Sequence, residues 1–534
     1  MKLQTLPYGV GTDFDPQRGC LPQTRVKFLD EIIEWVNNPN PSSPKVLALF
    51  GQAGTGKSCI VHEVARRFRR LNRLTTSYCI VRGEPSSREC YRFFTTVAHS
   101  LCTRHPAFKT RLGKVFSHNR ELLSVQSYAL LFESLLRDPL TDLHFIGPEL
   151  IVIDALDESE DAFSRRRDMF AFHRFLAKRL PELPANFRIL VTSRPEVDIL
   201  DAFTESPLVR RLHMDDPQLS DGVDDDIRTY VRAKLSKAKI AEADMEMLVK
   251  KAEGLFQWAS VACDYIGYPP AGLSSVYCLR SMLSSPQTSE DAERLDDLYS
   301  TVLEAHFNMK HSQVRHNFQS VMRQVLGTIS PLSITSLNIM CHHAAGGSAT
   351  NNFTDVSDVV KHMSALLSNV VSSNLTLPIA PLHTSFRDFL TDPNRSGKFY
   401  VNMDKAHDQL AHATLRTMQE MLRFNICELE TSYHLNTEVP DLNDRIERCI
   451  PSALWYSCRF WAEHLAHISE FNIDLLKCIK TLIKEKFLFW LEVLSLKGEM
   501  AVATTALFAL RTWLGQMRDN VSMSKTVIPC RRLY

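Results

Sequence analysis

The chain has 534 residues, of which 44% are hydrophobic, and its 62 basic and 61 acidic side chains leave a formal charge of +1. This length and composition predict a globular protein with more than one hydrophobic core, in roughly three or four domains. The balanced charge excludes a global electrostatic field that would favour nucleic acid or acidic membranes, so we expect no nucleic-acid partner.

Targeting and redox patterns point to one compartment. Met1–Asp13 has no apolar stretch of signal-peptide length, and no apolar run approaches the roughly 18 residues of a membrane span. The 13 cysteines include no Cys-x-x-Cys pair. Several lie in apolar periodic segments, where a free thiol packs as a small hydrophobe: Cys59, Cys79, Cys263 and Cys458. We therefore expect a cytoplasmic protein without a membrane span.

The first predicted elements lead into a sheet. Met1–Arg18 is rich in Gly, Pro and Asp and is expected to be loosely ordered, whereas Pro22–Trp35 has helical apolar spacing. From Lys45 to about Arg194, short apolar strands alternate with helices, which predicts a parallel sheet with helices on both faces. The predicted strands are Lys45–Phe50, Ser77–Val81, Leu150–Asp154 and Phe187–Thr192, and the predicted helices are Ser58–Leu71, Ser87–Cys102, Glu121–Leu135 and Asp168–Leu180.

Beyond Asp215, strand signals are rare and most of the chain is predicted to be helical. A mixed segment, Pro331–Tyr400, includes a predicted strand at Leu375–Pro381. Ala406–Gly515 is predicted to be helical throughout, and the tail Met523–Tyr534 is expected to be disordered. The remaining predicted helices are Asp224–Leu235, Ala241–Ala252, Phe256–Ile266, Asp291–Leu326 and Thr384–Leu390.

Gly51–Ser58 fits the eight-residue phosphate-binding loop. It joins a predicted strand to a predicted helix, where glycines let backbone N–H groups turn toward a polyphosphate and the helix dipole adds positive charge. Lys57 can reach the outer phosphates, and Ser58 can ligate magnesium. The alternative is a glycine-rich turn that only caps a helix. The predicted nucleotide-binding residues are Gly51, Gln52, Ala53, Gly54, Thr55, Gly56, Lys57, Ser58 and Cys59.

An acidic element ends the predicted strand at Asp154. Its carboxylate is predicted to face the magnesium held by Ser58, from an adjacent or next-but-one strand. Asp157 and Glu158 follow at the transition to a loop, where a carboxylate can orient or deprotonate an attacking water. We therefore predict Ser58 and Asp154 as metal ligands and Asp157 and Glu158 as catalytic residues, with a solvated acidic loop as the alternative.

A third apolar strand ends in Thr192-Ser193-Arg194-Pro195. The carboxyl ends of strands line the ligand crevice of an open parallel sheet, so Arg194 is predicted to point at a terminal phosphate and to act in catalysis. The alternative is an ion pair between Arg194 and a surface carboxylate.

Two other clusters have ordinary explanations. Cys341-His342-His343 lacks a second ligand pair at suitable spacing and is not predicted to bind a metal. The helix after the loop ends in four arginines, which suit the negative pole of its dipole and are expected to be solvated: Arg66, Arg67, Arg69 and Arg70.

Together these motifs resemble the NACHT family, within the STAND class of signalling NTPases, and in particular its fungal branch with a nephrocystin-type P-loop region. Asp154–Glu158 is similar to the acidic element of that family, and Ile189–Pro195 to its sensor strand. The resemblance runs from about Gly19 to Leu514. It also includes Gly19–Arg25, Ile32–Trp35, Gly254–Ala259, Leu382–Leu390 and Pro451–Trp461.

The resemblance implies a further site residue and shows two departures. In related switches the histidine equivalent to His383 touches the β-phosphate of ADP, which implies His383 as a latch; the alternative is a histidine of a helix cap. Related switches carry Gly-Leu-Pro where Gly254-Leu255-Phe256 stands, and that proline helps to hold adenine, so base recognition does not carry over. The usual N-terminal effector and C-terminal repeats are not visible, so a shortened member or a fragmentary sequence is expected.

The expected fold class is an α/β P-loop NTPase domain, a parallel sheet with helices on both faces, followed by helical, winged-helix-like and all-α regions. The predicted bounds are 1–44 for an N-terminal linker and first helix, 45–214 for the P-loop NTPase (NACHT) domain, 215–330 for a helical domain, 331–403 for a winged-helix-like domain, 404–520 for a C-terminal helical domain and 521–534 for the tail.

The resemblance implies a signalling switch that is closed with a nucleoside diphosphate and open with a triphosphate. It further implies homo-oligomers on activation, slow hydrolysis and a protein effector. The expected cofactors are ATP or GTP, the corresponding diphosphate, and Mg²⁺. Two alternatives stay open: a turnover ATPase or kinase, and a binding scaffold with an inactive nucleotide site.

Overall fold

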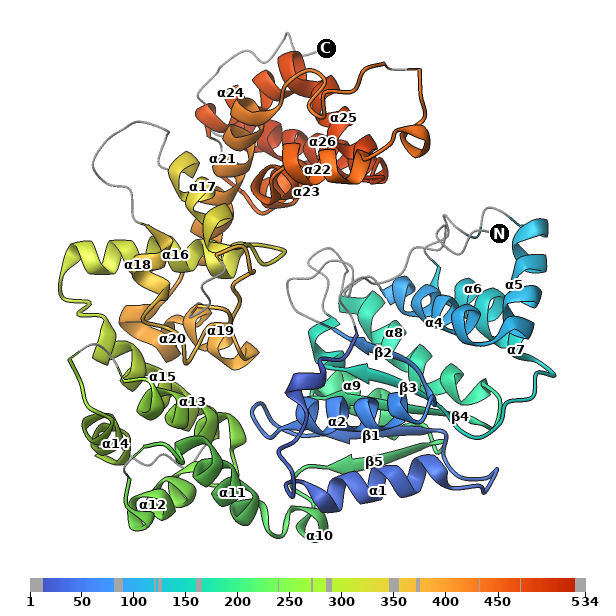
Figure 1. The fold of residues 1–534 in the computed structure, drawn as a ribbon. Coiled ribbons are helices and arrows are strands. Elements are labelled where there is room, and N and C mark those ends of the chain that lie inside the picture. The colour runs from blue at the N-terminus through green and yellow to red at the C-terminus, as the bar shows by residue number, and fades with distance from the viewer. Residues whose placement is uncertain are drawn as a thin grey trace. The chain divides into compact units, whose positions relative to one another are not determined.

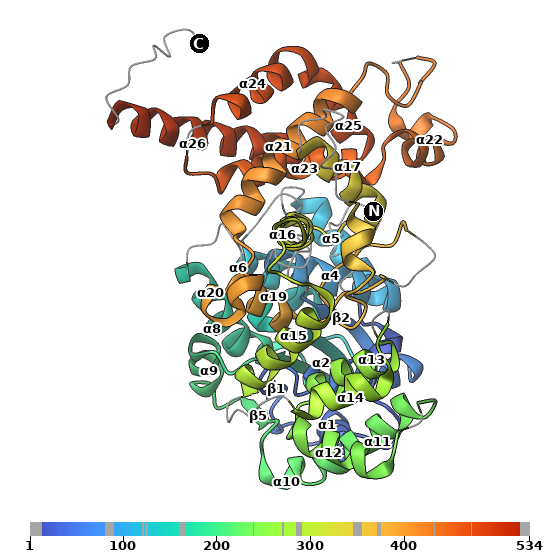
Figure 2. The same cartoon turned by 90° about the vertical axis from the view of Figure 1, so that its left-hand side faces the viewer.

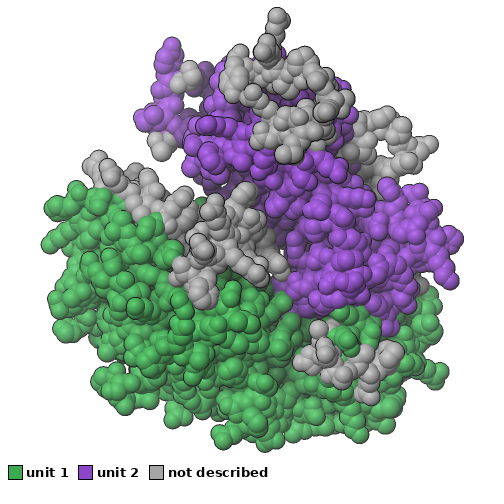
Figure 3. Space-filling model, turned by 180° about the vertical axis from the view of Figure 1, so that it is seen from behind, with its two compact units in different colours: residues 1–298 green, residues 299–534 purple. Residues whose placement is uncertain are grey.

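The computed structural model describes residues 13–80, 90–119, 122, 127–159, 166–238, 240–269, 272–284, 291–344, 355–370, 375–431, 433–470 and 472–523. The chain divides into two compact units, Met1–Leu298 and Tyr299–Tyr534 (Figure 3). The finer domain bounds expected from the sequence stay predictions. Of the tail expected to be disordered, Met523 ends a helix and residues 524–534 lie outside the described part.

The first unit is built on a five-stranded sheet in the order β2-β3-β4-β1-β5 (Figure 1). All neighbouring strands run parallel, which confirms the predicted parallel sheet. Because β4 lies between β1 and β3, the strand that ends at Asp154 is next but one to the strand that leads into the phosphate loop. The strands are β1 Val46–Phe50, β2 Leu74–Cys79, β3 Glu149–Asp154, β4 Phe187–Ser193 and β5 Val209–His213.

Helices cover both faces of the sheet, as predicted, because strand side chains alternate between two apolar cores. Along β1, Val46 and Ala48 join one core, whereas Leu47 and Leu49 join the other. The first core is completed by α4 Cys90–Arg104, α5 Pro106–His118, α6 Tyr128–Leu131, the π-helical turn Phe132–Arg137, α8 Arg166–Arg179 and α9 Val197–Thr204. The second is completed by α1 Val26–Asn37 and α2 Lys57–Arg70.

Some elements of this unit differ from the prediction. Residues 13–18 are not loose: Phe14 is buried in the second core, and Pro16–Arg18 forms a short helical turn. Strand β5 was missed because it reads Val-Arg-Arg-Leu-His, with charged side chains that an edge strand can leave exposed. Helices α5, α9 and α14 were also missed, and Ser87–Glu89 of one predicted helix lie outside the described residues.

A group of helices follows the sheet within the first unit. They lie side by side in Figures 1 and 2, and α11 packs against both α12 and α13. Their bounds are α10 Pro217–Ser220, α11 Val223–Leu235, α12 Glu242–Ala252, α13 Phe256–Gly267 and α14 Ser275–Ser284, with α15 Asp291–His306 continuing into the second unit. The predicted helices at Asp224–Leu235, Ala241–Ala252 and Phe256–Ile266 are therefore confirmed.

The second unit is almost entirely helical. No helix among the described residues is long and apolar enough to cross a membrane. Its main core surrounds Trp461, Trp490 and Trp513. The helices are α16 Ser312–Gly327, α17 Ile334–Ala344, α18 Val356–Val360, α19 Thr384–Thr391, α20 Pro393–Ser396, α21 Met403–Met421, α22 Leu442–Cys449, α23 Ser452–Ala466, α24 Ile473–Thr481, α25 Phe487–Leu496 and α26 Ala501–Met523.

Two predictions for this unit were wrong. Leu375–Pro381 forms no strand and contributes only isolated bridges, at Pro378 and Pro381, because proline has no N–H to continue a ladder. The helical prediction for Ala406–Gly515 fails between α21 and α22, where the described residues form turns and one short 3₁₀ turn.

A hydrogen-bonded pair of histidines, the half-buried His407 and the buried His464, joins α21 to α23. The Ile329 N–H donates to Tyr456 Oη, 3.0 Å away, and Tyr456 Oη lies 2.6 Å from His464 Nε2. Tyr456 therefore donates its own proton to Nε2, which leaves the ring proton of His464 on Nδ1 for His407 Nδ1, 2.9 Å away. A second proton on His407 Nδ1 would place two donors face to face, so the pair is built for neutral rings.

We expect the second unit to lose stability in mild acid. Burial, with His467 and Arg387 nearby, lowers the pKa of His407 to about 3, whereas an unfolded histidine titrates near 6.5. The unfolded chain then binds more protons below pH 6.5, so stability falls as the pH falls, by about 2 kcal/mol for His407 between pH 7 and pH 5.

Urea unfolding of wild type, His407→Gln and the exposed-site control His316→Gln at both pH values measures this effect. Between pH 7 and pH 5, the free energy of unfolding should fall by about 2 kcal/mol less in His407→Gln than in the other two proteins. Equal acid losses in all three proteins would contradict the assignment.

Candidate functional site

The phosphate loop joins the carboxyl end of β1 to the first turn of α2. Gly54 and Gly56 have φ angles of 81° and 92°, which side chains other than glycine rarely allow. Lys57 begins α2, and its Nζ donates to the carbonyls of Gly51, at 2.7 Å, and Gln52, at 3.0 Å. Burial lowers the pKa of Lys57 to about 8, against the opposing pull of Asp157 and Asp154. The predicted cation therefore lies inside the loop.

Ser58 and Asp154 come together as predicted. Ser58 Oγ donates to Asp154 Oδ1 at 3.2 Å, and Thr192 Oγ1 donates to the same oxygen. Thr192 Oγ1 also accepts from the N–H of Ala155 at 3.0 Å, so the end of β4 holds the end of β3. A hydroxyl and a carboxylate oxygen beside a phosphate loop are the hard ligands that Mg²⁺ prefers, so the residues fit this ion. Ser58 and Asp154 would hold it, and it would supply positive charge to the phosphates.

Arg194 and Asp157 also meet, although the sequence assigned them separate roles. The backbone N–H of Arg194 donates to Asp157 Oδ1 at 3.0 Å, and its Nε lies 3.2 Å from Oδ2. The Asp157 side chain is only 6% exposed, so this is not the surface pair considered as an alternative. Glu158, next in the chain, is half-buried. The catalytic roles of these three residues stay predictions.

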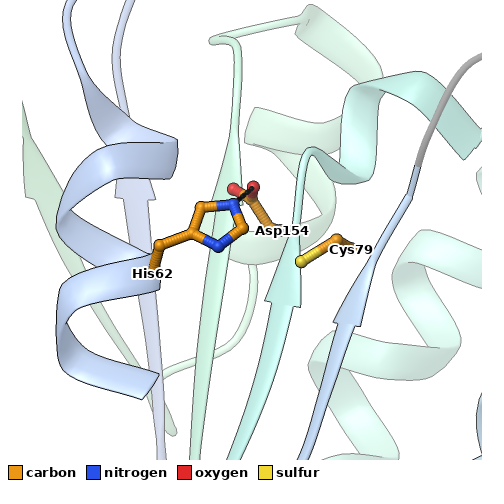
Figure 4. Close-up of side chains that lie close together, drawn as sticks. All are labelled: His62, Cys79 and Asp154. Atoms are coloured by element: carbon orange, nitrogen blue, oxygen red, sulfur yellow. Dashed lines mark ion pairs between the residues drawn. The ribbon is translucent and has the colours of Figure 1, made fainter. Parts of the chain in front are cut away.

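A His-Cys-Asp cluster includes the Asp154 carboxylate. Figure 4 shows His62 from α2, Cys79 from β2 and Asp154 from β3, each buried, with possible ligand atoms within 4.8 Å of one another. His62 Nε2 lies 3.9 Å from Asp154 Oδ2, the oxygen that Ser58 and Thr192 do not use. The cluster was missed in the sequence because its members come from three separate elements.

The hydrogen bonds of His62 argue against a metal in this cluster. The N–H of Asp15 donates to His62 Nδ1 at 2.9 Å, so the neutral ring carries its proton on Nε2, the atom facing Asp154. A metal ligand at Nε2 would need that nitrogen unprotonated. Burial also raises the pKa of the Cys79 thiol, which disfavours the thiolate that metals bind. His62 therefore faces Asp154 Oδ2 with its protonated Nε2 and is not a metal ligand.

The cysteines that the structure describes are free thiols. Cys79, Cys263 and Cys458 are buried, as predicted, but Cys59 is exposed and does not pack as a hydrophobe. It lies on the first turn of α2, next to Ser58, where helix periodicity directs it away from the core formed by Ile60 and Val61. Its predicted contact with nucleotide stays a prediction.

His383 belongs to the second unit and caps helix α19. Its Nδ1 accepts from the Ser385 N–H at 3.2 Å and lies 2.6 Å from Ser385 Oγ, which in turn lies 2.7 Å from Tyr299 Oη. This is the helix-cap geometry considered as an alternative. Because Nδ1 accepts a hydrogen bond, the neutral ring carries its proton on Nε2. This tautomer could donate a hydrogen bond to a phosphate oxygen. Its contact with nucleotide stays a prediction.

The loop also receives contacts that the sequence did not reveal. The N–H of Gln257, at the start of α13, donates to the Gly54 carbonyl at 3.0 Å. Arg25, just before α1, donates from Nη2 to the Thr55 carbonyl at 2.7 Å. The only sequence signal was that both residues fall within segments of the family resemblance.

Part of the chain is similar to known proteins. Residues 24–194 match the family described as Nephrocystin 3, N-terminal. The vegetative incompatibility protein HET-E-1 of Podospora anserina is 22% identical over 421 residues, which cover 72% of this chain and 28% of that protein. The chain thus spans little more than a quarter of that relative.

A solved structure was also matched, that of a Signal Transduction ATPase with Numerous Domains (STAND) protein with a tetratricopeptide repeat sensor from Pyrococcus horikoshii. It is 12% identical, with 92% of this chain and 64% of that chain covered and a TM-score of 0.37, too low to establish a common overall fold. The nephrocystin-type match, however, spans the phosphate loop, Asp154 and Arg194. Together with the similarity to HET-E-1, this match supports a relationship between the chain and the NACHT-type STAND NTPases.

Proposed function

We propose that the chain is a cytoplasmic nucleotide switch, closed with a nucleoside diphosphate and open with a triphosphate, which oligomerises when open and is reset by slow hydrolysis. The observation that carries this proposal is the pairing of Arg194 with Asp157 at the carboxyl end of the sheet. An arginine that can leave Asp157 for a γ-phosphate distinguishes triphosphate from diphosphate. Its partner exchange gives the site two states.

The site can supply the energy that a switch requires. Moving an equilibrium from 1:99 to 99:1 takes roughly 5.5 kcal/mol of differential binding. Charge-assisted hydrogen bonds contribute about 1.5 to 3 kcal/mol each, so a few contacts to one γ-phosphate are sufficient. Lys57, Arg194 and a magnesium ion on Ser58 and Asp154 would make them.

The two alternatives make different predictions for turnover. A turnover enzyme would be faster, because kinases typically turn over at roughly 1 to 100 per second. We expect the switch to stay below about 0.1 per second, and a scaffold with an inactive site not to hydrolyse at all. Chromatography of nucleotide released from the denatured protein would identify the base as adenine or guanine.

The latch is tested by His383→Leu, which removes the imidazole proposed to touch the β-phosphate of the diphosphate. One lost hydrogen bond costs the closed state roughly 1 to 3 kcal/mol and leaves the open state unaffected. Diphosphate release should become about 5- to 150-fold faster, with more oligomer in the absence of any trigger. Stopped-flow release and light scattering on the same preparation measure both quantities.

The matched control is His316→Leu, which replaces an exposed histidine of α16 in the same unit. It should leave release and mass unchanged. If His383→Leu released diphosphate at the wild-type rate and kept the wild-type monomer fraction, the latch hypothesis would be wrong and His383 would only cap α19.

A further inference from the structure

Arg25 connects separate parts of the first unit. It is 5% exposed, and its backbone N–H donates to Asp226 Oδ2 on α11 at 2.9 Å. Its Nη2 donates to the carbonyl of Thr55, in the phosphate loop, at 2.7 Å. Its guanidinium carbon lies 4.7 Å from the centroid of the Phe256 ring on α13, within cation–π distance. One buried residue therefore contacts the loop and two helices beyond the sheet.

A second contact ties the same turn of the loop to the same helix. Gln257, next to Phe256, donates its N–H to the Gly54 carbonyl at 3.0 Å. The approach is so close that a Cβ at Gly54 would lie 2.7 Å from the Cβ of Gln257. Consecutive carbonyls, those of Gly54 and Thr55, are thus held by groups from outside the loop. The loop and the start of α13 cannot separate without losing the Gln257 bond and, in addition, either the Arg25–Thr55 bond or the Arg25–Phe256 contact.

Neighbouring side chains hold Phe256 in place beside Arg25. Its ring is fixed by an edge-on contact with Tyr230, 6.0 Å between centroids, and Tyr230 Oη donates to Ser260 Oγ at 3.0 Å. An aromatic face attracts a guanidinium, which an aliphatic side chain cannot do in the same way. Burial lowers the pKa of Arg25, and Asp226 opposes this shift, so the buried cation depends on such partners.

We propose that Arg25 is a positioning residue which, held by Phe256, clamps the phosphate loop to α13 and thereby slows nucleotide release. The inference rests on the proposed nucleotide site and adds a control element to it. Phe256 acts on the loop through Arg25. Release requires the loop to loosen, and the clamp resists that loosening.

The test compares Phe256→Leu, Phe256→Tyr, Arg25→Met and the double variant Arg25→Met/Phe256→Leu. Fluorescent ADP, and fluorescent GDP in parallel, are displaced by excess unlabelled nucleotide in a stopped-flow instrument. A desolvated cation–π contact predicts release about 5- to 30-fold faster in Phe256→Leu and in Arg25→Met. Phe256→Tyr keeps a ring face and should release at close to the wild-type rate.

The double variant shows whether Phe256 and Arg25 act together or slow nucleotide release independently. If Phe256 acts through Arg25, the double variant releases nucleotide no faster than Arg25→Met alone. Thermal unfolding of each variant shows whether it is folded at the assay temperature. Wild-type release from a folded Phe256→Leu protein, or single effects that multiply in the double variant, would overturn the clamp.

The result is distinguishable from failure of the proposed function. If wild type releases diphosphate and triphosphate at the same rate and never changes mass, the switch hypothesis is wrong. The clamp can still be tested, because the release rates of the variants can still be compared with that of wild type. If wild type switches but the Phe256 and Arg25 variants release normally, only the clamp is wrong.

Discussion

Replacing Lys57 with alanine is expected to lower nucleotide affinity by roughly 10²- to 10⁴-fold. The change removes a mobile cation that can hydrogen-bond to two phosphates at about 1.5 to 3 kcal/mol each, which gives that range. The backbone cradle of Gly54 and Gly56 remains, so residual weak binding is expected. Titration with a fluorescent nucleotide in the presence of magnesium measures the effect.

Two further variants separate loss of charge from loss of folding. Lys57→Met keeps the apolar stem and should lose affinity to the same extent. Because burial already disfavours the charged form of Lys57, this variant should unfold at or above the wild-type temperature. Lys27→Ala removes an exposed lysine paired with Asp221 and should bind as wild type does. Wild-type affinity in folded Lys57→Ala would show that the phosphates lie elsewhere.

The phosphate loop and its flanks could be predicted because their information is local. Glycines, a lysine and a hydroxyl stand at fixed offsets between an apolar strand and an amphipathic helix, and such a pattern needs no distant contact. The parallel sheet was likewise predictable from alternation along the chain, and so was the position of Asp154 at a strand end. Strand β5 could not be predicted in this way. It lies at the edge of the sheet, where charged side chains are tolerated, so its sequence lacks the apolar pattern of a buried strand.

The partners of the site residues could not be read from the sequence because they depend on tertiary packing. Thr192 reaches Asp154 across 38 positions, and the Arg25 backbone reaches Asp226 across 201. Arg194 and Asp157 were each predicted for the site, but their pairing follows from β3 and β4 being neighbours. Sequence patterns identify the chemistry of side chains, whereas the sheet order determines which side chains meet.

The Arg194–Asp157 pair indicates different roles for Asp157 and Glu158. Both oxygens of Asp157 are engaged by Arg194, so Asp157 is suited to holding the arginine, and Glu158 is the better candidate to orient or deprotonate the attacking water. Asp157→Asn is therefore expected to release Arg194 and to destabilise the first unit. Because Arg194 is 24% exposed, we expect a loss of roughly 1 to 3 kcal/mol, below that for a fully buried pair.

Glu158→Gln, by contrast, is expected to bind triphosphate within a few-fold of wild type and to hydrolyse it about 10²- to 10⁴-fold more slowly, the usual worth of a general base. The phosphate and metal contacts of Lys57, Ser58 and Asp154 remain, while the water loses its carboxylate. Single-turnover phosphate release measures the chemical step, and light scattering should show triphosphate-dependent assembly that persists longer. The control Glu205→Gln removes an exposed carboxylate paired with Arg174 and should hydrolyse normally. Unchanged phosphate release from Glu158→Gln would remove Glu158 from the chemistry and leave the general base to be sought elsewhere around the phosphate loop.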